Sequence, residues 1–186
     1  MRKLYRPEAP EILRENAARW TENYLERRHF YWPKESYPSI REKLGEMTQT
    51  HCAFCDGPLG VESRETVEHF RPKSQFPELA YTWDNLFPCC DVCQSSKREA
   101  FHELLLKPDA REYRFSRYFM VDYRTGAIEA SAIADETGQQ SARITVGLYG
   151  LNSPARKRAR LRELEYYRSK DNPVLDDYSY RFFLES

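Results

Sequence analysis

Apolar side chains recur at helical spacing in the first fifty residues of the chain. Over the approximate range Glu11–Arg28 they fall three or four positions apart, which predicts an amphipathic helix that begins directly after Pro10. A second, shorter helix is predicted for Ser39–Met47. Stripes of this kind normally pack against a protein core, so residues 1–50 are expected to form a helical extension. The first stripe consists of Ile12, Leu13, Ala17, Trp20, Tyr24 and Leu25.

The middle of the chain changes to short extended segments. Residues 61–70, with Val and Thr near their end, predict a strand that the segment around Pro72 breaks. Residues 81–87 predict a second extended segment, and the approximate range Cys90–Leu106 predicts a helix. The order strand, strand, helix predicts a ββα module within residues 51–107.

A β-hairpin is predicted after this module. Aromatic and β-branched residues between Glu112 and Ala130 flank a turn at Arg124-Thr125-Gly126, as the two strands of a hairpin would. The hairpin therefore belongs to a third region, residues 108–186.

The rest of this third region predicts helices. Gln139–Tyr149 carries the first. The second is predicted for approximately Pro154–Lys170, because Ser153 suits the N-cap and proline suits the first helical position. A last helix is predicted to begin near Pro173.

Composition describes a water-soluble chain with a modest core. The 186 residues are 40% hydrophobic and 31% charged, which suits one domain with helical additions or two small domains. No apolar run approaches the ~18 residues of a membrane span, and the first residues lack the apolar stretch of a secretory signal. A cytoplasmic protein is expected.

The charge is balanced overall but not locally. The 29 Lys and Arg equal the 29 Asp and Glu, which excludes a strongly basic nucleic-acid binder at the level of the whole chain. Residues 151–170 hold seven basic and two acidic side chains, whereas residues 171–186 hold four acidic and one basic. The basic segment could bind DNA, RNA or an acidic partner, or it could be a solvated face over the apolar positions Leu161, Leu164 and Tyr167.

Four of the five cysteines form two C-x-x-C pairs, Cys52 with Cys55 and Cys90 with Cys93. This spacing predicts a tetrahedral structural Zn²⁺ site with four thiolate ligands. The fifth, Cys89, adjoins Cys90 and could be an alternative ligand, but it is expected to pack in the core. The two pairs are 34 residues apart, against about 15–20 in a common zinc site. The insert is therefore expected to carry residues with a function besides zinc binding.

The insert and its far edge hold residues that suit phosphodiester hydrolysis. His69 can act as a general base, because an unperturbed histidine titrates near neutrality. Glu68 precedes it, Asn85 follows on the second extended segment, and Gln94 and Lys97 come after the second cysteine pair. Successive strand residues face opposite sides, so a strand must end or bulge for Glu68 and His69 to share one site.

These segments, in this order, resemble the HNH (ββα-metal) endonucleases. The segments are Cys52-x2-Cys55, Val67-Glu68-His69-Phe70-Arg71-Pro72-Lys73-Ser74, Trp83-Asp84-Asn85-Leu86 and Cys90-x2-Cys93-Gln94-x2-Lys97. The wider chain is similar to the branch found with retrons and Septu-type anti-phage systems. That likeness adds Arg6-Pro7, Tyr81-x-Trp83 and Ile144-Thr145-x2-Gly147-Leu148-x2-Leu151-Asn152. The expected fold class is thus α+β: a zinc-stapled ββα-metal core with N-terminal helices, an added β-hairpin and C-terminal helices.

The resemblance implies a role for each site residue. Glu68 and Gln94 would bind a catalytic Mg²⁺ or Mn²⁺, His69 would be the base, Asn85 would support the histidine, and Lys97 would neutralise a phosphate. Gln94 stands where the family usually has Asn or His, and its longer side chain predicts weak activity, a preference for Mn²⁺, or loss of activity.

Further expectations concern substrate and partner. Arg71 and Lys73 are candidate contacts to a phosphate backbone beside Lys97, or solvated loop charges. The resemblance implies a DNA endonuclease that acts as the effector of a phage-defence system beside an ATPase subunit. Two alternatives stay open: a non-catalytic zinc module that binds nucleic acid or a protein, and a nuclease directed at RNA or tRNA.

Overall fold

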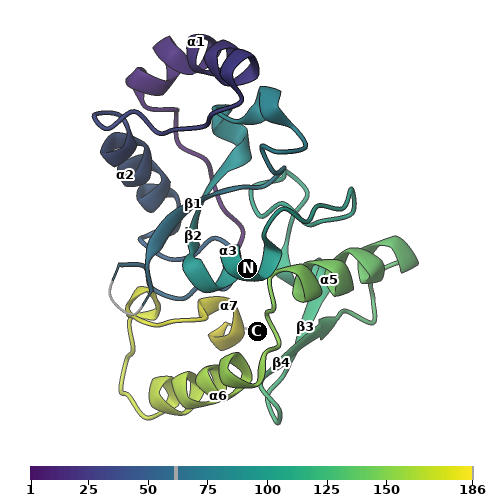
Figure 1. Ribbon diagram of the computed structural model, residues 1–186. Coiled ribbons are helices and arrows are strands. Elements are labelled where there is room, and N and C mark those ends of the chain that lie inside the picture. The colour runs from purple at the N-terminus through teal and green to yellow at the C-terminus, as the bar shows by residue number, and fades with distance from the viewer. Residues whose placement is uncertain (61–62, 186) are drawn as a thin grey trace.

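Two small antiparallel sheets and seven α-helices make up the described part of the chain. The computed structural model describes residues 1–60 and 63–185. Figure 1 shows α1 and α2 at one end, β1, β2 and α3 in the middle, and α6 and α7 at the other end. The elements are α1 (Glu11–Arg27), α2 (Tyr37–Thr48), β1 (Glu65–His69), β2 (Leu86–Cys90), α3 (Asp91–Lys97), α4 (Phe115–Tyr118), β3 (Phe119–Asp122), β4 (Ala127–Ala130), α5 (Glu136–Leu148), α6 (Pro154–Arg168) and α7 (Arg181–Leu184).

The two N-terminal helices confirm the prediction made from the spacing of apolar residues. Helix α1 begins after Pro10 and buries Leu13 and Trp20. Trp20 packs on Tyr81 with ring centroids 5.5 Å apart, so α1 covers the loop between the strands of the first sheet. Helix α2 begins two residues earlier than predicted and packs against β2 through a face that includes Ile40.

Strands β1 and β2 form an antiparallel pair in which Glu65 lies opposite Cys90 and His69 lies opposite Leu86. Helix α3 follows β2 without a loop and packs against both strands. The strand predicted for residues 61–70 occupies Glu65–His69, and residues 61 and 62 lie outside the described residues. The second predicted segment begins as a 3-10 turn at Trp83–Asn85, and the strand starts only at Leu86.

The long helix predicted for Cys90–Leu106 is wrong, because α3 ends at Lys97. The next residue, Arg98, has φ +52° and ψ −129°, which no helix can continue. The chain beyond it runs through turns and buries Leu105 and Leu106. The backbone N–H of Leu106 donates to Thr145 Oγ1 at 3.1 Å, which joins this segment to α5.

The C-terminal region agrees with its prediction in part. Strands β3 and β4 pair around the predicted turn. Part of the segment predicted as the first strand instead forms the short helix α4. Helices α5 and α6 form where predicted, and the Ser153 hydroxyl caps α6 by accepting from the N–H of Arg156. The helix expected to begin near Pro173 is wrong, because only a 3-10 turn at Leu175–Asp177 and the single turn of α7 form there.

Part of the basic charge of α6 lies inside the protein. Arg160 is fully buried, and its guanidinium donates to Gly126 O at 2.6 Å and to Leu151 O at 2.8 Å. Gly126 has φ +74°, and a side chain there would clash with the carbonyl of Lys157. The hairpin turn therefore docks closely on α6. Arg158, Arg162, Arg168 and Lys170 stay exposed.

Residues from all three predicted regions share one hydrophobic core, which includes Leu13, Phe87 and Phe183. The division into three regions stays a prediction. Arg6, far from β2 in sequence, donates to Trp83 O at 2.8 Å and to Leu86 O at 2.9 Å. Within the described ranges, the helices are too short or too polar to cross a membrane.

A buried ion pair fastens the C-terminal segment to the turn of the first cysteine pair. Arg181 Nη2 lies 2.6 Å from Asp56 Oδ1, and both side chains are at least 95% buried. The same guanidinium donates to Thr48 O at 3.1 Å, and the backbone N–H of Arg181 donates to Asp56 Oδ2 at 2.7 Å.

The variant Arg181→Ala is expected to lose about 3–5 kcal/mol of unfolding free energy, because it leaves the Asp56 carboxylate buried without its partner. Urea unfolding followed by circular dichroism measures the loss. The matched control is Arg2→Ala, which removes a partly exposed guanidinium paired with Asp176 and Glu185 of the C-terminal segment. It should cost less than about 1 kcal/mol. Equal losses in the two variants would contradict the assignment.

Candidate active site and metal centre

Four cysteine thiols converge at the base of the first sheet. The Sγ atoms of Cys52, Cys55, Cys90 and Cys93 all lie within 4.8 Å of one another, and all four residues are buried. The Sγ atoms of Cys55 and Cys90 are 3.7 Å apart. A tetrahedral zinc site with Zn–S distances of about 2.3 Å places its sulfurs about 3.8 Å apart. The cluster can therefore hold a structural metal ion such as zinc.

Backbone hydrogen bonds shape each cysteine pair. In the first pair the N–H of Asp56 donates to Cys52 O at 2.9 Å, which closes a tight turn. In the second pair the N–H of Cys93 donates to Cys90 Sγ at 3.3 Å, as Cys90 caps α3. Cys89 is fully buried outside the cluster, and burial raises the pKa of its thiol, so it packs as a neutral side chain as predicted.

A buried arginine lies against the cluster. Arg156 Nη2 is 3.0 Å from Cys93 Sγ and 3.7 Å from Cys90 Sγ. Its Nη1 donates to Tyr149 O at 2.6 Å. Burial alone would lower the pKa of Arg156, but the neighbouring thiolates raise it above its usual value. Four thiolates around one Zn²⁺ leave an excess of negative charge, which this guanidinium offsets in part.

The sequence did not reveal this role. Arg156 lies 63 residues after Cys93, and the sequence places it simply among the basic side chains of residues 151–170. Its position beside Ser153 at the start of α6 turns it inward, toward the cysteines.

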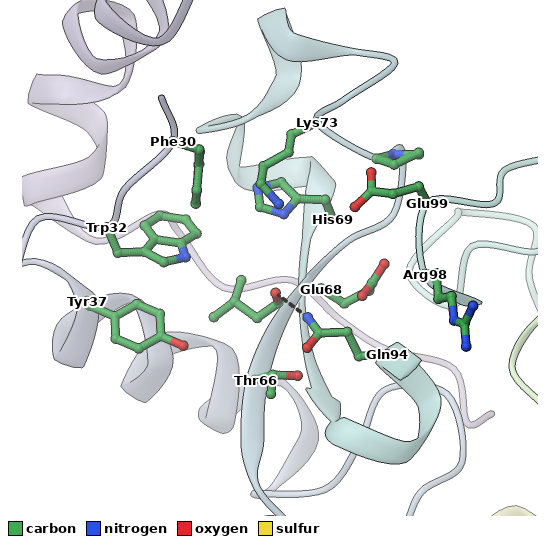
Figure 2. Close-up of a pocket in the computed structure, with 12 residues that line it drawn as sticks. Phe30, Trp32, Tyr37, Thr66, Glu68, His69, Lys73, Gln94, Arg98 and Glu99 are labelled. Atoms are coloured by element: carbon green, nitrogen blue, oxygen red, sulfur yellow. Dashed lines mark hydrogen bonds between the residues drawn. The ribbon is translucent and has the colours of Figure 1, made fainter. Parts of the chain in front are cut away.

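A cavity of about 380 Å³ lies beside the C-terminal end of β1 and brings together several of the predicted site residues. Figure 2 shows three aromatic rings on one side of it, Arg98 and Glu99 on the other, and Lys73 beside His69 between them. Glu68 and His69 both line the cavity, because β1 ends at His69. The lining consists of Phe30, Trp32, Tyr37, Thr66, Val67, Glu68, His69, Pro72, Lys73, Gln94, Arg98 and Glu99.

His69 is held in a defined tautomer. Its Nε2 lies 2.8 Å from Ala80 O, and because a carbonyl can only accept, Nε2 carries the proton. Among the hydrogen bonds of the described residues none reaches Nδ1, which keeps its lone pair. Burial and then the charge of Lys73 lower the pKa of His69 to about 4. The imidazole is therefore neutral near pH 7.

Glu68 forms a buried ion pair with Lys97. Lys97 Nζ lies 2.6 Å from Glu68 Oε1 and donates to His69 O at 3.0 Å. Burial raises the pKa of Glu68, and Lys97 and Gln94 work against that rise. The side chain of Lys97 is 0% exposed, so the expectation that it contacts a phosphate is wrong for this conformation. It positions Glu68 and the end of β1 instead.

Gln94 and Asn85 both bind backbone groups. Gln94 Nε2 donates to Val67 O at 3.1 Å (Figure 2). Asn85 Oδ1 accepts from the N–H of Arg71 at 2.8 Å, and its Nδ2 donates to Leu79 O at 3.1 Å. Asn85 thus closes the loop that carries Ala80, the carbonyl partner of His69.

Arg71 and Lys73, the two residues of this loop predicted to contact a nucleic-acid phosphate backbone, differ in position. Lys73 lines the cavity, with Nζ 4.9 Å from the ring centroid of Phe30. Arg71 lies outside the lining, between the rings of Phe76 and Phe101, each 5.3 Å from the guanidinium carbon.

Sequence reasoning missed the aromatic side of the cavity and Arg98. Phe30 and Trp32 come from the segment between α1 and α2, and Tyr37 begins α2. The signal available was the aromatic run Phe30-Tyr31-Trp32. Nothing local indicates that it packs on His69, because the contact spans almost forty residues of sequence.

Comparison with known proteins supports one relationship. No family model matches the chain. The chain is 37% identical over 95 residues to the Septu protein PtuB of Bacillus thuringiensis, an alignment of 50% of this chain and 36% of that protein. It is 31% identical over 85 residues to the Septu protein PtuB of Bacillus mycoides strain KBAB4, covering 38% of this chain and 29% of that protein. The chain thus spans about a third of the length of these curated relatives.

The variant Arg156→Met should release bound zinc about 10- to 100-fold faster, because the thiolates lose the neighbouring positive charge. Transfer of zinc to a colorimetric chelator measures the rate. The control Arg158→Met removes an exposed charge two positions along the same helix and should leave the rate unchanged. Equal rates in the two variants would exclude Arg156 from the metal centre.

Proposed function

We propose that the chain is a zinc-stapled, metal-dependent HNH endonuclease that hydrolyses DNA phosphodiester bonds. The observation that carries the proposal is the state of His69. A neutral imidazole, with Nε2 bonded to Ala80 O and Nδ1 unbonded among the described residues, lines one cavity together with Glu68 and Gln94. A neutral imidazole with an unbonded Nδ1 can take a proton from water, and its pKa of about 4 makes it a weaker base than an unperturbed histidine.

His69 acts as the base in this proposal. Its Nδ1 accepts a proton from the attacking water, and Ala80 O stabilises the imidazolium that results, because the Nε2–H bond strengthens with positive charge. Asn85 keeps that carbonyl in place by closing the loop at Leu79. Asn85 is therefore a positioning residue.

Glu68 and Gln94 are the residues that would hold a divalent cation such as Mg²⁺ or Mn²⁺. Lys97 hydrogen-bonds Oε1 of Glu68, so the second carboxylate oxygen and the Gln94 amide oxygen would be the two hard ligands. Two protein ligands suit a weakly held ion that keeps most of its waters. Such an ion would stabilise negative charge on the phosphate and on the leaving oxygen. Lys73, at the same cavity, supplies positive charge from the chain itself.

Similarity to the two Septu PtuB proteins supports a role in anti-phage defence. We place the chain there as an effector beside an ATPase subunit. The exposed charges of α6, Arg158, Arg162 and Arg168, offer a surface for DNA or for that partner. A net charge of zero favours DNA binding that depends on the partner, because phosphate contacts dominate affinity for DNA.

One observation favours a second function, a non-catalytic zinc module that binds nucleic acid or a protein. The Glu68 carboxylate already has a buried cation, the ammonium of Lys97, where an HNH enzyme would use a metal ion. In that reading Glu68 and Lys97 serve stability alone. Cleavage by the isolated protein or by its complex separates the two functions.

The variant His69→Ala is expected to lower the cleavage rate at least about 100-fold, because general-base catalysis contributes a factor of that size or more. Conversion of supercoiled plasmid, followed on gels with Mg²⁺ and with Mn²⁺, measures the rate. The control His102→Ala removes an exposed histidine outside the cavity and should cut normally. Equal cutting by both variants would remove His69 from the mechanism.

The cleavage rate should not change with pH around pH 6.5. Only neutral His69 can accept a proton, so the rate rises with pH through the pKa of His69, about 4, and is level above it. An unperturbed histidine would instead give a rise centred near pH 6.5. Initial rates of oligonucleotide cleavage between about pH 5.5 and 8 test this. A half-maximal rate near pH 6.5 would contradict it.

A further inference from the structure

The cavity beside His69 combines an aromatic side with a charged side, which carries Lys73, Arg98 and Glu99. Phe30, Trp32 and Tyr37 are each partly exposed and contact one another: Phe30 and Trp32 lie 5.2 Å apart edge-on, and Trp32 and Tyr37 lie 5.6 Å apart with planes 27° from parallel. Trp32 is also nearly parallel to the ring of His69, with centroids 6.1 Å apart. The aromatic surface therefore adjoins the proposed base.

Lys73 and Arg98 supply the positive charge of the charged side. The Lys73 ammonium lies at the edge of the aromatic surface, 4.9 Å from the Phe30 centroid. Arg98 is exposed at the mouth of the cavity, and its backbone has φ +52° and ψ −129°. This is a conformation that glycine normally takes in turns, and it is unfavourable for an arginine. Strain of this kind is commonly retained where a side chain has a function.

The depth of His69 limits what can reach it. His69 is 6% exposed, so a phosphate must enter the cavity to approach Nδ1. A volume of about 380 Å³ is near the lower end for small-ligand pockets. It has room for a group of nucleotide size.

We propose that the site takes an unpaired nucleotide, whose base stacks on Trp32 and its aromatic neighbours while its phosphate lies between His69, Lys73 and Arg98. The substrate class is thus single-stranded or locally unpaired DNA. Stacking on aromatic rings tolerates any base, so the site has little sequence preference of its own. This inference rests on the proposed nuclease function for its phosphate position, but binding can be measured without cleavage.

The experiment measures binding of fluorescein-labelled oligodeoxynucleotides to the full chain by anisotropy, with no added divalent metal. A mixed-sequence 12-mer is compared with its own duplex at one salt concentration. The single strand should bind at least about tenfold more tightly, and Trp32→Ala should weaken that binding about 5- to 150-fold, the range expected for one stacked base. Trp32→Phe should retain most of it.

The matched control is Tyr31→Ala, which removes the neighbouring aromatic side chain, 49% exposed and outside the cavity lining. It should bind the single strand like the unaltered chain. Circular dichroism and thermal melting confirm that each variant is folded. Equal affinity for single strand and duplex would overturn the inference, as would a single-strand preference that Trp32→Ala leaves unchanged.

The variant Arg98→Gly tests the role of Arg98 through two opposite effects, one on thermal stability and one on affinity for the single strand. It should raise the melting temperature, because glycine relieves the backbone strain, and it should weaken single-strand binding several-fold, because a phosphate contact is lost. Unchanged affinity would remove Arg98 from the site.

Two further arms separate this inference from the nuclease proposal. Strand-selective binding, with no cleavage by the chain alone or by its complex in the presence of Mg²⁺ or Mn²⁺, would support the inference and contradict the nuclease. Equal cutting of duplex and single strand, unaffected by Trp32→Ala, would do the reverse. A single-stranded RNA of the same sequence should bind through the same aromatic surface, and failure of Trp32→Ala to weaken its binding would count against stacking.

Discussion

The convergence of four thiols on one point is the constraint on which most of this structure depends. Cys90 ends β2 and caps α3, so a metal ion held by the four thiols would fix the strand and helix together and tie both to the turn of Cys52 and Cys55. The register of β1 on β2 runs from Glu65 opposite Cys90 to His69 opposite Leu86. An anchor at one end of this ladder therefore helps to define where His69 lies at the other end, about four residues away along each strand.

Buried cations join the C-terminal region to this anchor. Arg156 lies against the thiols, Arg181 pairs with Asp56 in the first cysteine turn, and Arg160 binds the carbonyls of the hairpin turn and the α5–α6 loop. A buried charge is costly unless it is paired or fully hydrogen-bonded, so each contact restricts the packing of α6 and α7 to a narrow range. The basic segment read from composition is thus partly structural. The same reasoning holds for Lys97, which secures Glu68 inside the protein.

The candidate site could be predicted in its polar half and not in its aromatic half. Glu68, His69 and Gln94 are close in space because two short strands and a helix follow one another with little connecting chain. Asn85 hydrogen-bonds the loop backbone, a contact that its position on the second segment indicated only in outline. Phe30 and Trp32 reach the cavity from a connecting segment with no periodic pattern, so only the packed structure places them on His69. The helix that stops at Lys97 was equally hidden, since residues 98–106 have an ordinary helical composition.

The sequence by itself determined the local features: the C-x-x-C spacing, the limits of α1 and of α6 with its Ser153 cap, and the turn of the hairpin at Gly126. Each of these depends on residues within a few positions of one another, whose geometry the backbone dictates. Tertiary structure alone decided which charges are buried, which tautomer His69 adopts, and which rings line its cavity. These depend on burial and on partners distant in the chain, because desolvation and pairing arise only after the segments have packed.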